Sequence, residues 1–392
     1  MELFKRSSFH FRICTWFFFL VFYWAIAGEL APIQAQSYRI VPITDSTAAN
    51  PNEVSVAIHP SKPNQVMAVS MQRAFEDGTP GITNFGYISY DGVLTWNEKS
   101  SPNPEKRVQG DDAIVMGLDD WAYHSYISFE SLRSTRPAVS SNGIFVTPFN
   151  LSRRKWGKPV PVIDHINTVE PFEDKPWLTI DRQPSSPYRG RMYVSWTRFD
   201  VYGSESPRDS THIYITHSTD FDGKKAISNF TMPIRISDRG GNAVDSSNTV
   251  EGAIPIVGLD STVYVVWSGP QGIVMDKSHD GGNTFGKDIP ITSHESGWDI
   301  GVPGIGRANG FPIPAFDRSD GPHRGRMYIN WIDRRGNDRD LNAYLTYSDD
   351  QGKSWSKPRI VHPPSQKGIQ YFTWMAVDPF DGSVNIAYLD RH

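Results

Sequence analysis

The stretch Ser348-Asp349-Asp350-Gln351-Gly352-Lys353-Ser354-Trp355 carries the chemistry of a tight turn at fixed positions. A hydroxyl and a carboxylate two residues apart, here Ser348 and Asp350, can accept hydrogen bonds from backbone N–H groups of such a turn. Gly352 supplies a backbone with φ > 0, which other residues resist. Trp355 is then placed to pack back on the sheet. The stretch therefore predicts a tight turn that connects two β-strands.

Three other stretches have versions of this pattern. A complete copy starts at Ser278, a shifted copy at Ser89, and a degraded copy without the closing aromatic at Ser218. The starts from Ser218 to Ser348 are 60 and 70 residues apart, and Ser89 lies 129 residues before Ser218, which is about two units. A fixed period of this size indicates a protein built from repeated units.

A second repeated element precedes these turns. Residues 188–196 (Tyr-Arg-Gly-Arg-Met-Tyr-Val-Ser-Trp) match residues 323–331 (His-Arg-Gly-Arg-Met-Tyr-Ile-Asn-Trp), and weaker versions lie at 263–267 and 384–388. An apolar segment comes before each version, so a unit has four strands with the turn between the third and the fourth. From about residue 37 short apolar runs alternate with turn residues, and no long 3.6-residue period interrupts them. We therefore expect an all-β protein with few helices.

Each unit has the strand content of one propeller blade. We predict a six-bladed β-propeller with four-stranded antiparallel blades. The blades are expected to begin near Glu53, Asp111, Glu173, Glu251, Asn309 and Tyr371. The sequence stops just after the second strand of the sixth blade, so either this last blade is incomplete or the chain is a fragment.

The N-terminus predicts export from the cytoplasm. Three basic residues precede an apolar run from Ile13 to Ala27, which is the pattern of a secretory signal. We expect residues 1–35 to be a signal peptide, cleaved near Ala27 or Ala35, and residues 36–392 to be a single secreted or periplasmic domain. An uncleaved membrane anchor is the alternative, although the run is short for a span of roughly 20 residues.

Composition limits the classes of function. The formal net charge of -4 gives no sign of nucleic-acid binding, and 12% aromatic residues fit a folded protein. The single cysteine, Cys14, lies in the signal segment, so the mature protein is expected to have no disulfide and no cysteine metal site. The histidines show no metal-binding motif, and the loop from Asp333 to Asp340 is read as solvated rather than as a Ca²⁺ site. We expect no cofactor and a monomer.

The turns and the blade repeat resemble the sialidase superfamily, whose propellers carry Asp-box (BNR) repeats. The resemblance covers roughly residues 50 to 392. It implies that the Asp boxes are structural and lie on the face away from the active site. It also implies a glycoside hydrolase acting on glycan termini, in which a Glu activates a Tyr nucleophile, an Asp is the acid/base and three arginines clamp the substrate carboxylate.

The resemblance assigns residues by their positions in the blades. Glu251 opens the fourth blade and Tyr371 opens the sixth, which are the family's Glu and Tyr positions, and Asp77 is the candidate acid/base. The candidate substrate-binding arginines of the same face are Arg73, Arg198, Arg307, Arg334 and Arg391. The repeated arginines of residues 189–191 and 324–326 are expected on the opposite face, as packing residues.

Two departures from the family keep other hypotheses open. The first blade opens with Asn52-Glu53, where the family has a clamp arginine, and Trp267-Ser268-Gly269 stands where another is expected. An acid at the first position would repel a carboxylate substrate. Three hypotheses follow: a sialidase-type hydrolase, a non-catalytic propeller that binds a glycan or protein, or a hydrolase or lyase acting on a different sugar, for example a neutral one.

Overall fold

The computed structural model describes residues 40–44, 50–76, 79–118, 120–130, 141–223, 225–295, 297–335, 340–363 and 368–391. The chain divides into two compact units, residues 1–42 and 43–392, and the strands belong to the second. The regular structure of the described residues is β-strand, which confirms the all-β prediction, and they contain no helix able to cross a membrane. The predicted signal segment lies outside the described residues.

The first nine described strands form one sheet, in which Ile82 pairs parallel with Val108, and the later strands form five smaller sheets. We describe them in six consecutive groups, in each of which the first two strands pair antiparallel. The first group contains β1 (Asn52–Ile58), β2 (Val66–Glu76), β3 (Thr79–Ser89) and β4 (Asn97–Ser100). The second contains β5 (Val108–Met116), β6 (Trp121–Phe129), β7 (Ser141–Asn150), β8 (Lys155–Trp156) and β9 (Val160–Ile166). The third contains β10 (Phe172–Ile180), β11 (Met192–Phe199), β12 (Ser210–His217), β13 (Ile234–Arg235) and β14 (Gly241–Asn242).

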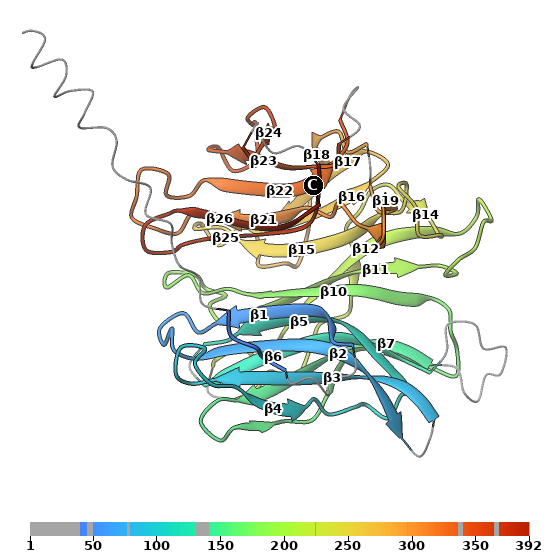
Figure 1. The fold of residues 1–392 in the computed structure, drawn as a ribbon, viewed down its shortest axis with the longest axis vertical. Coiled ribbons are helices and arrows are strands. Elements are labelled where there is room, and N and C mark those ends of the chain that lie inside the picture. The colour runs from blue at the N-terminus through green and yellow to red at the C-terminus, as the bar shows by residue number, and fades with distance from the viewer. Residues whose placement is uncertain are drawn as a thin grey trace, which may run out of the picture. The chain divides into compact units, whose positions relative to one another are not determined.

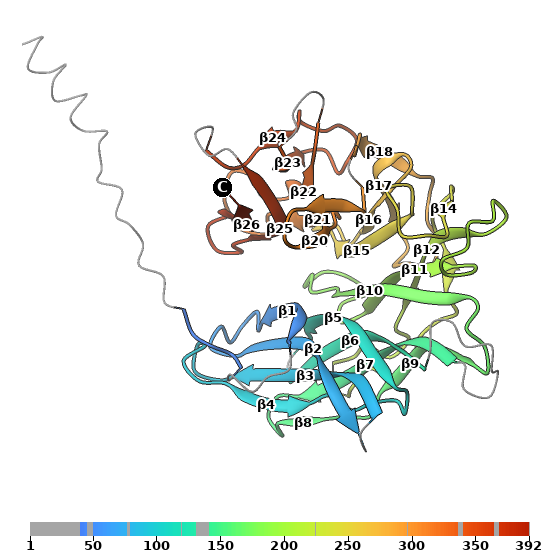
Figure 2. The same cartoon turned by 45° about the vertical axis from the view of Figure 1, so that its right-hand side comes forward.

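The later groups follow the same plan. The fourth contains β15 (Glu251–Val257), β16 (Val263–Gly269), β17 (Gly272–Ser278) and β18 (Ile289–Thr292). A separate hairpin, β19 (Ile300–Val302) and β20 (Gly306–Ala308), comes before the fifth group, which contains β21 (Ile313–Phe316), β22 (Met327–Asp333), β23 (Asn342–Ser348) and β24 (Arg359–Ile360). The sixth contains β25 (Ile369–Val377) and β26 (Val384–Arg391). Figure 2 shows the fourth group in yellow, with its strands in chain order.

The first strands of successive groups lie together. β1 lies beside β5, β5 beside β10 and β10 beside β15 (Figure 1). Each first strand begins within four residues of a predicted blade start. Trp177 of β10 also contacts Trp374 of β25, with ring centroids 5.0 Å apart, so first strands far apart in the sequence meet. First strands from different groups therefore lie close to one another.

The core lies between successive groups. Trp196, Trp267 and Trp331, which end the repeated element at residues 188–196, 263–267 and 323–331, are 0%, 1% and 0% exposed. Every residue of β16 and β22 is buried, because the groups on both sides cover both faces of these strands. Burying both faces accounts for the apolar run Val263 to Trp267 in β16 and for the lack of regular alternation in β22.

The predicted turns form the hydrogen bonds that their sequences require. Ser348 Oγ accepts a hydrogen bond from the Gly352 N–H at 2.8 Å, and Asp350 Oδ1 accepts one from the Ser354 N–H at 2.9 Å. Gly352 has φ 81, and a Cβ there would lie 2.2 Å from Met275 Cε of the preceding group. The turn therefore packs against a neighbouring sheet. Glycine is required at residue 352 because its φ is positive and because Met275 leaves no room for a Cβ.

Candidate functional site

A β-bulge near the start of five first strands shapes the candidate site. The pairing register shifts by the same step in β1, β5, β10, β15 and β25. The bulge residue in each has a positive φ: Glu53 (φ 52), Asp111 (φ 54), Lys175 (φ 51), Gly252 (φ 73) and Phe372 (φ 49). Bulges re-aim side chains and are common beside active sites. Left-handed backbone at non-glycine residues is uncommon, so its repetition here indicates a constrained arrangement.

The first three bulges are joined by a relay of hydrogen bonds. Glu53 Oε2 accepts a hydrogen bond from the Asp111 N–H at 2.7 Å, and Asp111 Oδ2 accepts one from the Lys175 N–H at 3.3 Å. Lys175 Nζ lies 2.6 Å from Asp111 Oδ1 and 3.7 Å from Glu53 Oε1. Asp174 and Glu251 occupy the positions just before two of the bulges, and we call Glu53, Asp111, Asp174, Lys175 and Glu251 the acid cluster.

The acid cluster separates the pKa values of its carboxyl groups. Burial opposes ionisation of Asp111, but Lys175 and the surrounding hydrogen bonds hold the pKa of Asp111 well below its usual range. Burial and the charge of Asp111 raise the pKa of Glu53 to about 8. The same two causes raise the pKa of Asp174, and burial raises that of Glu251 to about 8. At neutral pH one charged carboxylate therefore faces Lys175 among protonated carboxyl groups.

Glu251 is the most enclosed member of the cluster. Its side chain is 0% exposed, and neither carboxyl oxygen has a hydrogen-bond partner among the described residues. The next residue, Gly252, lies against Phe311, since a Cβ at Gly252 would be 2.4 Å from Phe311 Cγ. A buried carboxyl without a partner is costly to ionise, so the structure favours its protonated form.

Aromatic and basic side chains border the cluster. Trp298 stacks on Phe311 with centroids 5.2 Å apart, and the Arg307 guanidinium lies 3.5 Å from the centroid of Trp298. Arg307 is also 3.7 Å from Asp245, whose carboxylate accepts a hydrogen bond from the Tyr202 hydroxyl at 2.9 Å. Within the described residues, no group of three or more His, Cys, Asp or Glu side chains could hold a metal ion.

Tyr371 and Glu251, the residues assigned as nucleophile and activator, form no hydrogen bond with each other. Tyr371 is buried and packs in an apolar cluster with Ile300 and Ala343, whereas the Glu251 carboxyl group has no hydrogen-bond partner. Asp77, the predicted acid/base, lies outside the described residues. The catalytic roles of these three residues stay predictions.

The five predicted arginines lie in different surroundings. Arg307 borders the acid cluster. Arg198 instead forms an ion pair with the buried carboxylate of Glu173, with Nη2 to Oε1 at 2.7 Å. Arg334 donates to the Gly301 carbonyl at 3.1 Å and Arg391 to the Pro303 carbonyl, so both hold the β19–β20 hairpin.

The remaining arginine, Arg73, is exposed on β2. Lys175, which pairs with Asp111, was missed by the sequence reasoning because no motif marks it. The signal that could have revealed it is position, since Lys175 occupies the same bulge position as Glu53 and Asp111.

Comparisons with known proteins agree on the fold. No family model and no curated protein matches the sequence. A solved protein of unknown function from Dyadobacter fermentans matches with a TM-score of 0.55 and 12% identity over 90% of this chain and 93% of that one. A leech intramolecular trans-sialidase matches with a TM-score of 0.55 and 11% identity over 91% of this chain and 67% of that one.

The alpha-L-arabinofuranosidase of Fusarium graminearum is similar to the same degree. Its TM-score is 0.54 at 12% identity, over 87% of this chain and 89% of the fungal chain. These identities are low, so the matches bear on the fold alone. The chain has the fold that the leech trans-sialidase and the fungal arabinofuranosidase share, which confirms the resemblance to sialidase-like proteins at the level of fold.

Proposed function

We propose that this protein is a glycoside hydrolase that removes an uncharged sugar from the end of a glycan, with the acid cluster as its active site. We also propose that the chain forms a six-bladed propeller with its first strands around a central axis. We further propose that the protein is secreted or periplasmic after removal of its signal peptide. The contact between Trp177 and Trp374 supports a central arrangement of the first strands, because β10 and β25 belong to the third and sixth groups.

One observation carries the proposal: the carboxyl groups of Glu53 and Asp111 lie beside one ammonium group, with Lys175 Nζ 3.7 Å and 2.6 Å from them. Asp111 is held ionised by Lys175, while Glu53 has a pKa raised to about 8 and keeps its proton at neutral pH. Glycoside hydrolysis generally needs such a pair, one carboxylic acid and one carboxylate. The side chains of Glu53 and Lys175 are 35% and 25% exposed, so a ligand can reach this part of the cluster.

The proposed reaction uses water as its second substrate. Glu53 gives its proton to the glycosidic oxygen as the bond from that oxygen to the anomeric carbon breaks. The Asp111 carboxylate stabilises the positive charge that develops on the sugar ring. Water then adds through its oxygen to the anomeric carbon, and the proton that this water loses returns to the cluster and restores Glu53.

The charges near the cluster favour a sugar without a carboxylate. Lys175 is paired with Asp111 at 2.6 Å, and Arg307 is shared between Trp298 and Asp245. A sialic acid needs a free arginine clamp, and Glu53 stands where the family has one of its arginines. An arabinofuranoside, the substrate type named for the fungal protein, carries no carboxylate. A neutral sugar therefore fits these residues better than sialic acid does.

A second candidate is a propeller that binds a glycan without cleaving it. The enclosure of Asp111 favours it, because a carboxylate whose side chain is 8% exposed and paired with Lys175 is poorly placed to reach a reacting sugar ring. The sialidase reaction, with Tyr371 as nucleophile and Asp77 as acid/base, would in addition need Tyr371 and Glu251 to move into contact.

The experiment is a release assay on 4-nitrophenyl α-L-arabinofuranoside, other neutral aryl glycosides and 4-methylumbelliferyl sialoside. We expect turnover of a neutral glycoside, a loss of about 100-fold or more in Glu53→Gln, and little change in Tyr371→Phe. The rate should fall as pH rises through about 8, because Glu53 loses its proton there. Release of sialic acid that depends on Tyr371 would contradict the proposal, and no turnover of any glycoside together with glycan binding would support the non-catalytic candidate.

A further inference from the structure

A groove of about 760 Å³ lies between the third and fourth groups, at the end of the sheets that carries the acid cluster. One wall is the β11–β12 loop, residues 200–209, and the other is the stretch 240–244 together with Pro270 of the β16–β17 turn. The loop begins beside the acid cluster, because Phe199, the last residue of β11, pairs with Phe172, the first residue of β10. The groove and the proposed active site therefore belong to the same end of the sheets.

Tyr202 anchors the loop wall of the groove. Its ring contacts those of Phe172 and Phe199, with centroids 5.2 Å and 5.0 Å away, and its hydroxyl donates to Asp245 Oδ2 at 2.9 Å. Asp245 directly follows a residue of the opposite wall, and it lies 3.7 Å from Arg307, which borders the acid cluster. A chain of contacting side chains therefore connects the two walls with the acid cluster.

The side chains that line the groove are polar and carry no positive charge. Among the described residues of its walls none is Lys or Arg, whereas Glu205 and Asp209 supply carboxylates and Asn242 supplies an amide. Asp209 Oδ2 accepts a hydrogen bond from the Ser204 hydroxyl at 2.5 Å, and Oδ1 has no partner within the described residues. The walls therefore offer hydrogen-bond acceptors on both sides of the groove.

His212 adds a group that can donate or accept. Its Nδ1 lies 3.1 Å from Ser237 Oγ, and its Nε2 lies on the side of Gly240, since a Cβ at Gly240 would be 3.0 Å from it. Burial and the charge of Arg235 lower the pKa of His212, so the imidazole is neutral at neutral pH. The groove therefore presents donors and acceptors without a cation.

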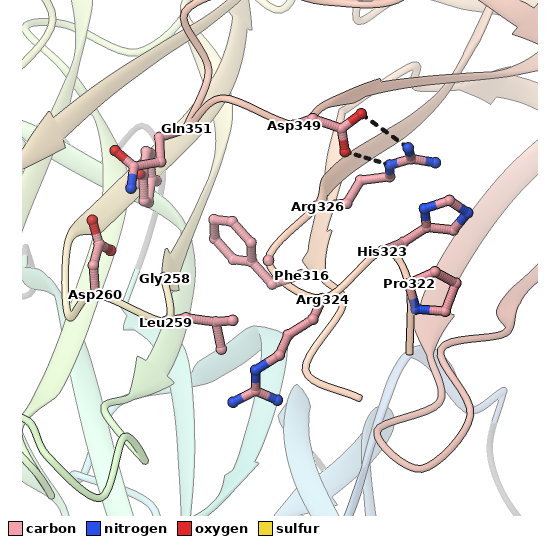
Figure 3. Close-up of a pocket in the computed structure, with 12 residues that line it drawn as sticks. Gly258, Leu259, Asp260, Phe316, Pro322, His323, Arg324, Arg326, Asp349 and Gln351 are labelled. Atoms are coloured by element: carbon pink, nitrogen blue, oxygen red, sulfur yellow. Dashed lines mark hydrogen bonds and ion pairs between the residues drawn. The ribbon is translucent and has the colours of Figure 1, made fainter. Parts of the chain in front are cut away.

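A second hollow, of about 520 Å³, lies at the opposite end of the first strands and has different charges. Its arginines are engaged by aspartates, Arg326 with Asp349 at 2.7 Å and Arg324 with Asp320 at 3.1 Å. Figure 3 shows the Arg326–Asp349 ion pair of this hollow. Its charged groups are satisfied within the protein, whereas the carboxylates of the groove form no ion pair within the described residues.

The charge of the groove limits the class of ligand. Two carboxylates repel an anion, and no group of three or more His, Cys, Asp or Glu side chains among the described residues could hold a metal ion. A sugar hydroxyl both donates and accepts hydrogen bonds, so an uncharged sugar can satisfy carboxylates, amide and imidazole together. The volume lies within the range of about 300–1,000 Å³ that is typical of small-molecule sites.

We propose that this groove is a subsite for the uncharged sugars that precede the released one, so that the protein acts on the ends of oligosaccharides. The prolines of the two walls, Pro207 and Pro270, offer apolar surface to the sugar rings. The link to cleavage rests on the proposed function, but binding of the sugars does not require cleavage.

The binding test uses Glu53→Gln, which is expected to bind oligosaccharides without cleaving them, and calorimetry as the measurement. The neutral probes are arabinotriose, xylotriose and maltotriose, and the charged probes are trigalacturonate and the trimer of glucosamine. Glu205→Ala and Asn242→Ala each remove an exposed side chain from one wall, and Arg208→Ala removes an exposed side chain of the same loop that does not line the groove. We expect a neutral trisaccharide to bind, both wall variants to weaken it about fivefold to tenfold, and Arg208→Ala to leave it unchanged.

A kinetic test separates the groove from the acid cluster. With Glu53 intact, the two wall variants should lower kcat/KM for release from the bound trisaccharide about tenfold. They should leave kcat/KM for the matching 4-nitrophenyl glycoside unchanged, because a single sugar does not reach the groove.

Three results would overturn the proposal: no neutral trisaccharide binds, Glu205→Ala and Arg208→Ala weaken binding equally, or a charged trisaccharide binds as tightly as the best neutral one. If no glycoside is cleaved but the wall variants still weaken binding, the proposed hydrolysis fails and the groove remains a glycan site. If the aryl glycoside is cleaved and the wall variants leave trisaccharide binding unchanged, the groove is not a subsite and the proposed hydrolysis remains.

Discussion

The first strands have opposite chemistry at their two ends. At their starts, which we call the acid end, the acid cluster lies on bulges, and its carboxyl groups surround one lysine, Lys175. At their far ends, which we call the arginine end, Arg182 and Arg318 donate hydrogen bonds to the carbonyls of Met116 and Val257. Both ends join neighbouring strands, but the acid end does so with groups whose charge depends on pH, and the arginine end with groups that stay charged.

The largest expected effect tests how deeply the acid end is buried. Asp111→Asn leaves the Lys175 ammonium without its 2.6 Å partner in a site where both side chains are at most one-quarter exposed. We expect the free energy of unfolding to fall by about 3 kcal/mol, because the charge left behind is costly. The measurement is urea denaturation at neutral pH.

The Arg326–Asp349 pair at the other end is the matched control. Its separation of 2.7 Å is similar to that of the Lys175–Asp111 pair, but its aspartate is 58% exposed. Asp349→Asn should cost less than about 1 kcal/mol. Equal losses in the two variants would show that the acid end is no more buried than the surface.

The second prediction separates backbone strain from crowding. Gly252 in the acid end and Gly92 in an Asp-box turn have similar positive φ values of 73 and 70. A Cβ at Gly252 would meet Phe311 at 2.4 Å, whereas a Cβ at Gly92 would have nothing within 4 Å. We expect Gly92→Ala to cost about 1 kcal/mol and Gly252→Ala about 3 kcal/mol, because the latter adds overpacking. Thermal unfolding of both variants tests this, and similar losses would mean that Phe311 moves aside freely.

The third prediction concerns pH. Burial raises the pKa of Glu251 from 4.5 to about 8, so the folded state binds more protons than the unfolded state between these values. The stabilisation is full below pH 4.5 and is lost as pH rises through about 8. Glu251→Gln should reduce the slope of unfolding free energy against pH by up to about 1.4 kcal/mol per unit in this window.

The control for this pH effect comes from the arginine end. Arg318→Lys should leave the slope between pH 4.5 and 8 as in the wild type, because neither side chain titrates in that range. A wild-type slope in Glu251→Gln would show that Glu251 is ionised in the folded protein, which would remove it from the protonated part of the acid cluster.

The sequence predicted the framework well because the framework follows local rules. The turns that start at Ser89, Ser278 and Ser348, the buried tryptophans of the second strands and the starts of the first strands all depend on short patterns of turn and apolar residues. The acidic residues at the strand starts were also noted in the sequence. Their roles could not be derived, because the bulges at Glu53, Asp111 and Lys175 depend on pairing between strands and leave no motif.

The candidate arginines show the limit of reasoning by position. Arg198 was expected to face a ligand, but the buried Glu173 holds it, with help from the Trp196 and His165 rings that bind the same carboxylate. Arg182 and Arg318 look unremarkable in the sequence and yet each binds the end of a first strand in the preceding group. Contact between distant segments is set by tertiary packing, which a single sequence does not reveal.

The smallest effect concerns the shifted Asp box, where the glycine comes one place early. Val93 donates its N–H to Ser89 Oγ at 2.9 Å, which is the contact that Gly352 makes with Ser348, and Val93 therefore has φ 64. A β-branched residue is strained in this conformation. Val93→Gly should raise the free energy of unfolding by about 1 kcal/mol, measured by urea denaturation, because the relief of strain exceeds the entropy that glycine adds to the unfolded chain. The matched change Leu94→Gly, at the next exposed position, should not raise the free energy of unfolding. If both variants were destabilised alike, Val93 would not be strained, and the hydrogen bonds of Ser89 and Asp91 would hold this turn without appreciable cost.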